Sequence, residues 1–224
     1  MSKSAGPPAV GRGRGAPLQA YVLHHYDWSE SSLILDLFTR ERGRVSVAAK
    51  GAKRPYSQLR AVLLPFQRIH VTLGRTPADE HAEIHNLRHA EWAGGVPMLG
   101  GAALFSGFYL NELLMKLLAR HDPHAALFDV YAATLPELDS DDELRVQSAL
   151  RAFELTLLQQ TGLLPDLSLT TQTQQAVRTD RRYGLSAEAG VDAGGDIGGD
   201  AGSISRVTTA AFSGLASQRF RMAH

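Results

Sequence analysis

The segment LQAYVLHHYDWSESSLILDLFTRERGRVSVAAK, residues 18–50, contains the patterns of three successive strands. The apolar runs LQAYVLHHY and SLILDLFT flank the polar connection DWSES, which predicts two strands joined by a loop. RERG then forms a short connection in which Gly43 is free to take a positive φ. In RVSVAAK, Val45 and Val47 fall on one face, as expected for a strand with one buried side.

Two more strands are predicted before residue 90. LLPFQRIHVTL, residues 63–73, is predicted as a strand with Pro65 at its start or at a bulge. EHAEIHNLR, residues 80–88, is predicted as the fifth strand. Five short strands with hairpin-like connections favour a small antiparallel barrel.

After Pro97 the apolar residues recur with a helical period. Residues 102–119 are apolar on almost every side, which predicts a helix buried in a second domain. Residues 124–138 form a second helix candidate, and residues 141–161 form a third. The chain therefore belongs to the α+β class, with a barrel followed by helices.

The third helix has start and stop signals of its own. SDDE, residues 140–143, has the spacing of a capping box with acid in the first turn. Gly162 and Pro165 close the helix. Its apolar residues are predicted to face a core: Leu144, Leu150, Phe153, Leu157 and Leu158.

The composition is that of a globular protein of 224 residues, 44% hydrophobic and 21% charged. There is no cysteine, which excludes disulfides and thiolate zinc sites. The N-terminus lacks the apolar core of a signal peptide, and charged residues interrupt the run at 102–119. We therefore expect a cytoplasmic protein with no membrane span, associated with the nucleoid if it binds DNA.

The formal net charge is zero, but it divides unequally between the two parts of the chain. Residues 1–75 contain 12 Lys and Arg against 4 Asp and Glu, whereas residues 76–224 contain 11 against 19. Such a division indicates separate domains and a polyanionic partner for the first. Residues 38–60 carry seven of the cations and a single acid, Glu41.

These cations occupy a hairpin turn, a strand end and the loop that follows, where a barrel rim would bring them together. Small barrels of this kind bind single strands with a basic groove and with rings that stack on bases. Tyr56 lies within the block, and Tyr26 and Trp28 lie in the first loop. The alternative is a solvated basic surface with core aromatics. The predicted DNA-binding residues are Arg40, Arg42, Arg44, Lys50, Lys53, Arg54, Tyr56 and Arg60.

Catalytic signatures are absent from the sequence. It contains no G-x-S-x-G elbow and no phosphate-binding loop with its lysine. His81, His85 and His89 do not match a catalytic spacing, so we expect imidazoles on the wet face of a strand. A metal-dependent hydrolase remains the third hypothesis, after a DNA-binding protein and an interaction adaptor whose basic rim binds an acidic partner. We expect no enzymatic activity.

Residues 20–169 resemble the bacterial RecO family of recombination mediators. The most specific match is AKGAKRP after TRERG, and the resemblance continues through ELLMKLLARHDPHAALFDVYAATL and LRAFELTLLQQTGLLPDL. It implies an OB-fold barrel followed by a helical domain. It also implies binding of single- and double-stranded DNA, annealing of complementary strands, and contacts with the single-stranded-DNA-binding protein and RecR that help RecA to load.

Two departures from the family pattern are visible. Many members carry a four-cysteine zinc site after a segment that is GLLPDL here, but SLTTQTQQAV follows without a cysteine, as in zinc-free members. We therefore expect no metal and no other cofactor. Family members also usually continue with more helix beyond the position of His224.

The resemblance and the charge division together suggest four parts. Residues 1–17 are predicted to be a disordered basic arm, 18–92 the OB-fold domain and 97–169 the helical domain. Residues 170–224 are predicted to contain an irregular hairpin, a glycine-rich linker and a short terminal helix.

The resemblance implies that the tail of the single-stranded-DNA-binding protein, which is acidic with an apolar end, binds to this chain. A receptor for such a tail needs an apolar groove beside a cation. Arg145 and Arg151, on the third helix, are predicted to receive the tail of the single-stranded-DNA-binding protein. The basic barrel rim is the rival site. Alternatively, both arginines pair with nearby acids and bind nothing.

Overall fold

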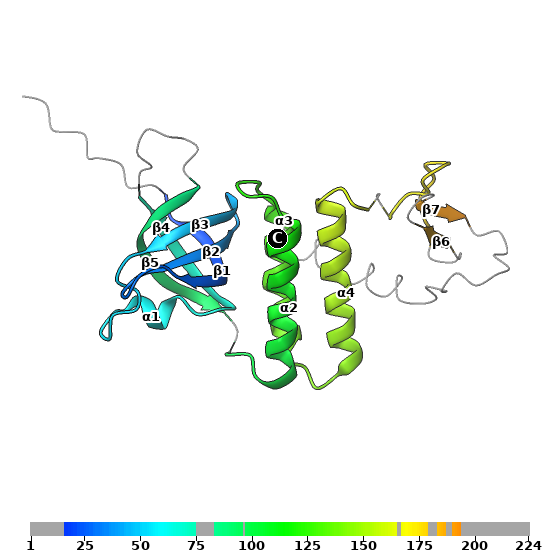
Figure 1. Ribbon diagram of the computed structural model, residues 1–224. Helices are drawn as coiled ribbons and strands as arrows, with labels where there is room; N and C mark the ends of the chain where they lie inside the picture. Colours follow the sequence, from blue (N-terminus) through cyan, green and yellow to red (C-terminus); the bar gives the residue numbers. More distant parts are fainter. Residues whose placement is uncertain are drawn as a thin grey trace, which may run out of the picture.

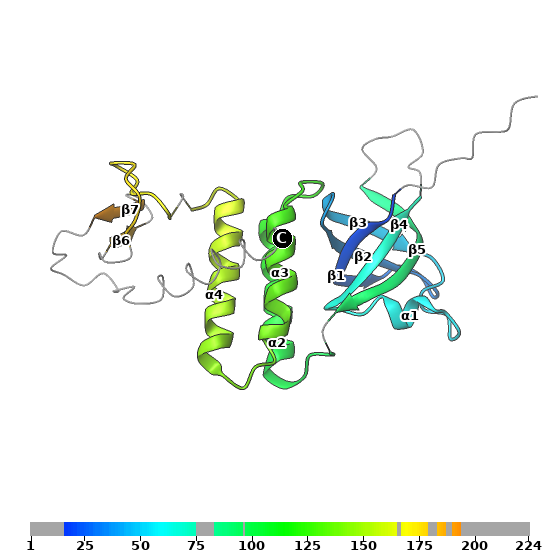
Figure 2. The same ribbon diagram turned by 180° about the vertical axis from the view of Figure 1, so that it is seen from behind.

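The computed structural model describes residues 16–74, 83–95, 97–164, 167–178, 183–186 and 190–193. Five strands form a closed barrel, three long helices follow, and a two-stranded hairpin comes last. The predicted barrel and the predicted helices after it are therefore confirmed. Figures 1 and 2 show the same order in space: the barrel, then α2 and α3, then α4, then the hairpin.

The barrel strands are β1 (Leu18–Asp27), β2 (Leu33–Thr39), β3 (Gly43–Ala49), β4 (Gln67–Leu73) and β5 (Ile84–Gly95). They are hydrogen-bonded in the closed order β1-β2-β3-β5-β4. Four pairings are antiparallel, whereas β3 and β5 run parallel, with Ser46 opposite Ile84. Parallel strands cannot be joined by a tight turn, and β4 and the short helix α1 (Leu59–Val62) lie between these two in the sequence.

The β2–β3 turn has the geometry that the sequence predicts. Gly43 has a φ of 65°. The hydroxyl of Thr39 accepts a hydrogen bond from the Arg42 amide at 3.1 Å and donates one to the Gly43 carbonyl at 2.8 Å. These bonds close the turn on itself and fix the register of β2 against β3.

Two strand predictions were wrong at their ends. β4 begins at Gln67 rather than residue 63, because residues 59–62 are helical and Phe66 has a φ of 65°, which interrupts an extended chain. The fifth strand continues to Gly95, well beyond residue 88. Residues 75–82, where the expected strand begins, lie outside the described residues.

β2 and the first part of β1, up to Leu23, are largely buried on both faces. Inside the barrel, Val22, Leu35 and Leu37 pack with Val45, Val47 and Ile69. On the outer face of the same strands, Tyr21, Leu23 and Phe38 belong to a second core that they share with the helices. The rings of Tyr21 and Phe38 contact that of Phe128 at centroid distances of 5.3 and 5.4 Å.

The helices are α2 (Gly101–Leu117), α3 (Ala125–Glu137) and α4 (Glu143–Gln160), and the hairpin is β6 (Tyr183–Ser186) with β7 (Gly190–Ala193). α2 was predicted to be buried all round, but Phe105, Phe108 and Tyr109 are exposed on it. In the part of the chain that the structure describes, no helix is long and apolar enough to cross a bilayer. The expected basic arm up to residue 15 and the expected terminal helix lie outside the described residues.

α4 corrects two details of the sequence prediction. Its N-cap is Asp142, whose carboxylate accepts hydrogen bonds from the amides of Leu144 and Arg145, so Ser140 does not form the predicted capping box. Phe153 and Leu157 are buried as predicted, but Leu144 is 78% exposed. Leu144 and Phe153 are nine residues apart, so at 100° per residue they lie on opposite sides of the helix.

Polar side chains also join the barrel to the helices. The Asn111 amide on α2 donates to the Leu23 carbonyl on β1 at 3.0 Å and accepts from the Tyr131 hydroxyl at 2.6 Å. Burial raises the pKa of Tyr131 well above its usual range, which keeps this hydroxyl protonated as a donor. The name barrel–helix seam is used below for the contact region that contains Asn111 and Tyr131 and also the pair of Arg40 on the barrel with Asp129 on α3.

Candidate nucleic-acid interface

Residues 50–58, between β3 and α1, form a loop that we call the basic loop. Gly51 has a φ of 73°, which turns the chain sharply after β3. Backbone bonds from Arg54 to Gly51 at 3.2 Å and from Ser57 to Arg54 at 3.0 Å then make consecutive turns. Ala52 is buried in the barrel core, so the loop is anchored at one point while its charged residues remain outside.

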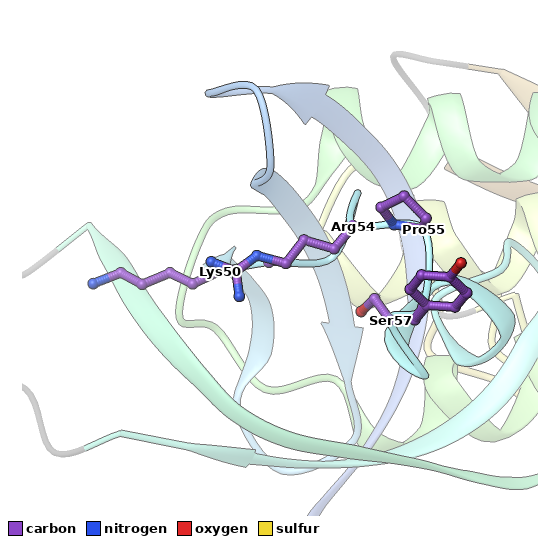
Figure 3. A pocket seen from close by; sticks show the side chains of 6 residues that line it. Lys50, Arg54, Pro55 and Ser57 are labelled. Carbon is purple, nitrogen blue, oxygen red and sulfur yellow. The ribbon is translucent and has the colours of Figure 1, made fainter.

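The basic loop surrounds an open pocket of about 490 Å³, lined by Lys50, Gly51, Arg54, Pro55, Tyr56 and Ser57. In Figure 3 the side chains of Lys50 and Arg54 extend in the same direction. The Arg54 side chain lies against Gly51, where an added Cβ would meet its Nε at 3.5 Å. The Tyr56 side chain is 96% exposed, so both faces of its ring are open to a ligand.

Lys50, Arg54 and Arg60 are exposed, and none of the three forms an ion pair with a described carboxylate. Arg60 lies on α1, just beyond the basic loop. Sequence reasoning had selected all three cations and Tyr56. It had missed Pro55 and Ser57, which line the pocket, because neither has a charge or a ring to signal a role.

Lys53 has a different environment from its neighbours. Its Nζ forms an ion pair with Asp27 at 3.1 Å and donates to the Ser29 carbonyl at 3.3 Å. Its backbone amide donates to the Ser31 carbonyl at 3.0 Å. Lys53 therefore joins the basic loop to the β1–β2 loop, residues 28–32.

The β1–β2 loop and the strand end before it carry exposed rings. Tyr26 is 45% exposed and Trp28 is 56% exposed. The ring of His24 meets that of Tyr26 edge to face at 4.5 Å, and the Trp28 amide donates to the Ser32 carbonyl at 3.2 Å. Cations and open rings therefore lie on two loops that are hydrogen-bonded to each other.

Two of the predicted DNA-binding arginines lie at the barrel–helix seam instead. Arg40 makes two hydrogen bonds of 2.9 Å to the Asp129 carboxylate on α3, which raises the pKa of Arg40. Arg44 donates to the Met115 carbonyl, one of the last carbonyls of α2. Arg44 thus lies at the C-terminus of α2, where a cation is favourable, whereas the charge of Arg40 is neutralised by the Asp129 carboxylate.

Arg42 is exposed but lies at the opposite end of β3 from Lys50. The seven residues of β3 lie between the two, which separates them by roughly 25 Å. The eight predicted residues therefore do not form one cluster: Lys50, Arg54, Tyr56 and Arg60 stay together, and Lys53 connects them to the β1–β2 loop.

The two arginines predicted to bind a partner tail are both engaged in ion pairs. Arg145 pairs with Glu137 at the end of α3, including an Nη2–Oε1 distance of 3.0 Å, which raises the pKa of Arg145. Arg151 pairs with Glu154, which also accepts from the Tyr109 hydroxyl at 2.8 Å. These pairs correspond to the alternative in which the arginines are neutralised by nearby acids.

The histidines do not assemble a metal centre in the described ranges, where no group of three metal-binding side chains occurs. His81 lies outside the described residues. The prediction of a wet strand face was wrong for His85, which is only 9% exposed and packs edge to face on His121 at 5.5 Å. Burial, His121 and Arg42 together lower the pKa of His85.

Comparison with known proteins gives consistent matches along the chain. The family model described as recombination protein O N terminal matches residues 17–95, and the model described as recombination protein O C terminal matches residues 100–221. A DNA repair protein RecO from Polaromonas naphthalenivorans is 58% identical over 172 residues, which are 77% of this chain and 67% of the relative. Proteins of the same name from Delftia acidovorans and Verminephrobacter eiseniae are 54% and 52% identical over the same shares.

Proposed function

This chain belongs to the RecO family of DNA repair proteins, and we propose that it binds single- and double-stranded DNA through the basic loop and the β1–β2 loop. One observation carries the proposal. Lys50, Arg54 and Arg60 are exposed beside the open ring of Tyr56, and no described carboxylate neutralises them. Such cations gain free energy by replacing the counterions of a phosphate backbone.

The proposed work on DNA is annealing of complementary strands and, with RecR, assistance to RecA loading. Annealing requires that the charge of two strands be neutralised while base pairing supplies the specificity. A surface with a few unpaired cations is suited to this, because it holds strands without reading their sequence. The proposal requires no catalytic residue and places the protein on DNA in the cytoplasm.

A salt series with an oligonucleotide tests the proposal. Each lost phosphate contact reduces the slope of log K against log salt by about 0.7 for single strands. We expect the combined variant Lys50→Ala, Arg54→Ala, Arg60→Ala to reduce the slope by about 2. Arg42→Ala removes an exposed cation from the other end of β3, and we expect it to leave the slope unchanged.

The same experiment separates DNA binding from the adaptor hypothesis. The folding of each variant is checked by circular dichroism. If the wild-type protein is folded but binds no oligonucleotide even at low salt, the adaptor hypothesis replaces this one. If Arg42→Ala and the triple variant change the slope equally, DNA is bound elsewhere on the barrel.

We also propose that the acidic tail of the single-stranded-DNA-binding protein is received at Arg145 and Arg151 on α4. A tail carboxylate would have to displace Glu137 from Arg145 or Glu154 from Arg151. A labelled tail peptide should therefore bind more tightly to Glu137→Gln, which frees Arg145, and more weakly to Arg145→Ala. Loss of the peptide only in the Lys50, Arg54, Arg60 variant would assign the tail to the basic loop.

A further inference from the structure

We infer that the pocket of the basic loop is a site for the terminal phosphate monoester of a DNA strand, so that the protein favours a phosphorylated strand end over the interior of a strand. The inference rests on the proposed DNA binding and adds to it the part of the strand that the pocket takes. The ligand is a dianion at a strand end, in place of the monoanionic diester that links two nucleotides.

The first observation is that two cations converge on one pocket. Lys50 and Arg54 both line it, and neither forms an ion pair with a described carboxylate. In Figure 3 their side chains extend in the same direction, away from Pro55. The charge of Lys53 is already neutralised by Asp27 at 3.1 Å. The pocket therefore presents two positive charges to a ligand.

Two cations match a terminal phosphate better than an internal one. A phosphate monoester carries a charge of about −1.5 to −2 at pH 7, because its second pKa is about 6. A phosphodiester inside the strand carries a single negative charge. An internal phosphate would therefore leave one of the two cations without a counter-charge, whereas a terminal phosphate neutralises both.

The second observation is that the donors of the pocket are held in place. The Arg54 side chain lies against Gly51, where an added Cβ would be 3.5 Å from Nε and 3.8 Å from Cζ. Ser57 lines the same pocket, and its hydroxyl has no hydrogen-bond partner among the described residues. A guanidinium can donate two parallel bonds to a phosphate, and a hydroxyl can donate a third.

The shape of the pocket favours a strand end as well. It is a hollow of about 490 Å³ beside Tyr56, whose side chain is 96% exposed. A terminal phosphate enters such a hollow with the strand leaving on one side only, whereas an internal phosphate needs room for the strand on both sides. Arg60, which lies on α1 and does not line the pocket, can hold the strand that leads away from it.

Short oligonucleotides of one sequence test the inference when they carry a 5′-phosphate, a 3′-phosphate or hydroxyls at both ends. We expect a phosphorylated strand to bind roughly fivefold more tightly than the strand with two hydroxyls, as for one further exposed ion pair. The two phosphorylated strands show which end the pocket takes. Equal affinities for all three strands would overturn the inference while DNA binding stands. If no strand binds, the inference and the proposed function both fail.

Variants of the basic loop assign the effect to the pocket. Lys50→Ala and Arg54→Ala should each remove the preference for the phosphorylated strand. Arg60→Ala is the matched control, because it removes an unpaired cation outside the pocket and should weaken the binding of all three strands by the same factor. Ser57→Ala should reduce the preference and leave the salt slope unchanged, because the hydroxyl carries no charge. A preference that survives in both Lys50→Ala and Arg54→Ala would overturn the inference.

The pH dependence of the preference is an independent measurement. A phosphate monoester takes up a proton as the pH falls through about 6, so it loses the charge that distinguishes it from a diester. We expect the ratio of the affinities for the phosphorylated and unphosphorylated strands to fall toward one between about pH 7.5 and about pH 5.5. The histidines of the protein titrate in the same range but act on both strands, so their effect cancels in the ratio. A ratio above one that does not change with pH would contradict the inference.

Discussion

Gly43 is the residue at which the barrel approaches the helices most tightly among the described glycines. Its φ of 65° is one that other residues rarely adopt, and a Cβ there would overlap the carbonyl oxygen of Asp122 in the α2–α3 connection. The neighbouring Arg44 carbonyl accepts a hydrogen bond from His121 at 2.9 Å. A side chain at position 43 would therefore force the β2–β3 turn away from the helices.

We expect Gly43→Ala to destabilise the protein by several kcal/mol, the sum of a left-handed alanine and a backbone overlap. Gly51→Ala is the matched control, because Gly51 has a similar φ but meets only the flexible Arg54 side chain. Its cost should be about 1 kcal/mol. Urea denaturation measures both, and equal losses for the two variants would show that the approach to Asp122 is unimportant.

We expect His85 to make the stability of the protein dependent on pH. The buried imidazole, facing His121 and Arg42, has a pKa below the value of about 6.5 that it has when unfolded. As the pH falls below 6.5, the unfolded chain binds a proton that the folded protein does not, so stability is lost. Above pH 6.5 the His85 imidazole is neutral in both the folded and the unfolded protein, so no stability is lost through this group.

We expect His85→Gln to lose less stability than the wild type between pH 7.5 and 5.5, measured by urea denaturation at each pH. His89→Gln, which removes an exposed histidine from the same strand, serves as the control for the loss of an imidazole. An unchanged dependence in His85→Gln would assign the pH effect to other groups.

Helix α2 meets the barrel through a glycine. A Cβ on Gly107 would lie 2.8 Å from Cε1 and 2.9 Å from Cζ of Phe66. Phe66 is buried and also contacts Phe108 at a centroid distance of 5.2 Å, so its ring has little freedom to move. The strained backbone at Phe66 and the missing side chain at Gly107 are two parts of the same contact.

Gly107→Ala therefore combines two opposing effects. Alanine favours a helix interior by about 1 kcal/mol over glycine, whereas overfilling a packed core costs about 1–3 kcal/mol. Because Phe66 is confined, we expect net destabilisation of about 1 kcal/mol. The control is Ser106→Ala, one position earlier on the same helix, which should be neutral or slightly stabilising. Thermal unfolding compares the two variants. A stabilised Gly107→Ala protein would show that the contact between position 107 and Phe66 is not tight.

The strands that the sequence predicted well are those with local signals. Gly43 and the alternation at Val45 and Val47 defined the β2–β3 hairpin, and nearby residues alone determine it. β5 was misplaced because most of its side chains are exposed, which leaves little apolar pattern to read. The start of β4 was missed because Phe66, which has a positive φ, packs on Phe108 of α2, a contact far along the chain that no local pattern reveals.

The candidate site was predicted in the same uneven way. Lys50, Arg54, Tyr56 and Arg60 belong to one local segment, and composition was enough to select them. Arg40 has the same charge and lies nearby in sequence, but its partner Asp129 is 89 residues away. No local pattern distinguishes a cation at the barrel–helix seam from one on the surface, so a contact of this range required the structure.

The barrel and the helices share one core across β1 and β2, and we expect them to unfold together. Both tryptophans, Trp28 and Trp92, lie in the barrel, so tryptophan fluorescence reports on it, while far-UV circular dichroism is dominated by the helices. Coincident urea midpoints for the two signals are the expected result. Separate transitions would mean that the barrel–helix seam contributes little to stability.

Because β2 and the first part of β1 are buried on both faces, the barrel cannot easily be transferred to another protein. Many small barrels are exchanged between proteins as interchangeable modules, because their outer surface is already suited to water. A graft of residues 16–95 onto an unrelated protein would leave Tyr21, Leu23 and Phe38 uncovered. The barrel can be transplanted only with α2 and α3, or onto a host that supplies an equivalent apolar surface.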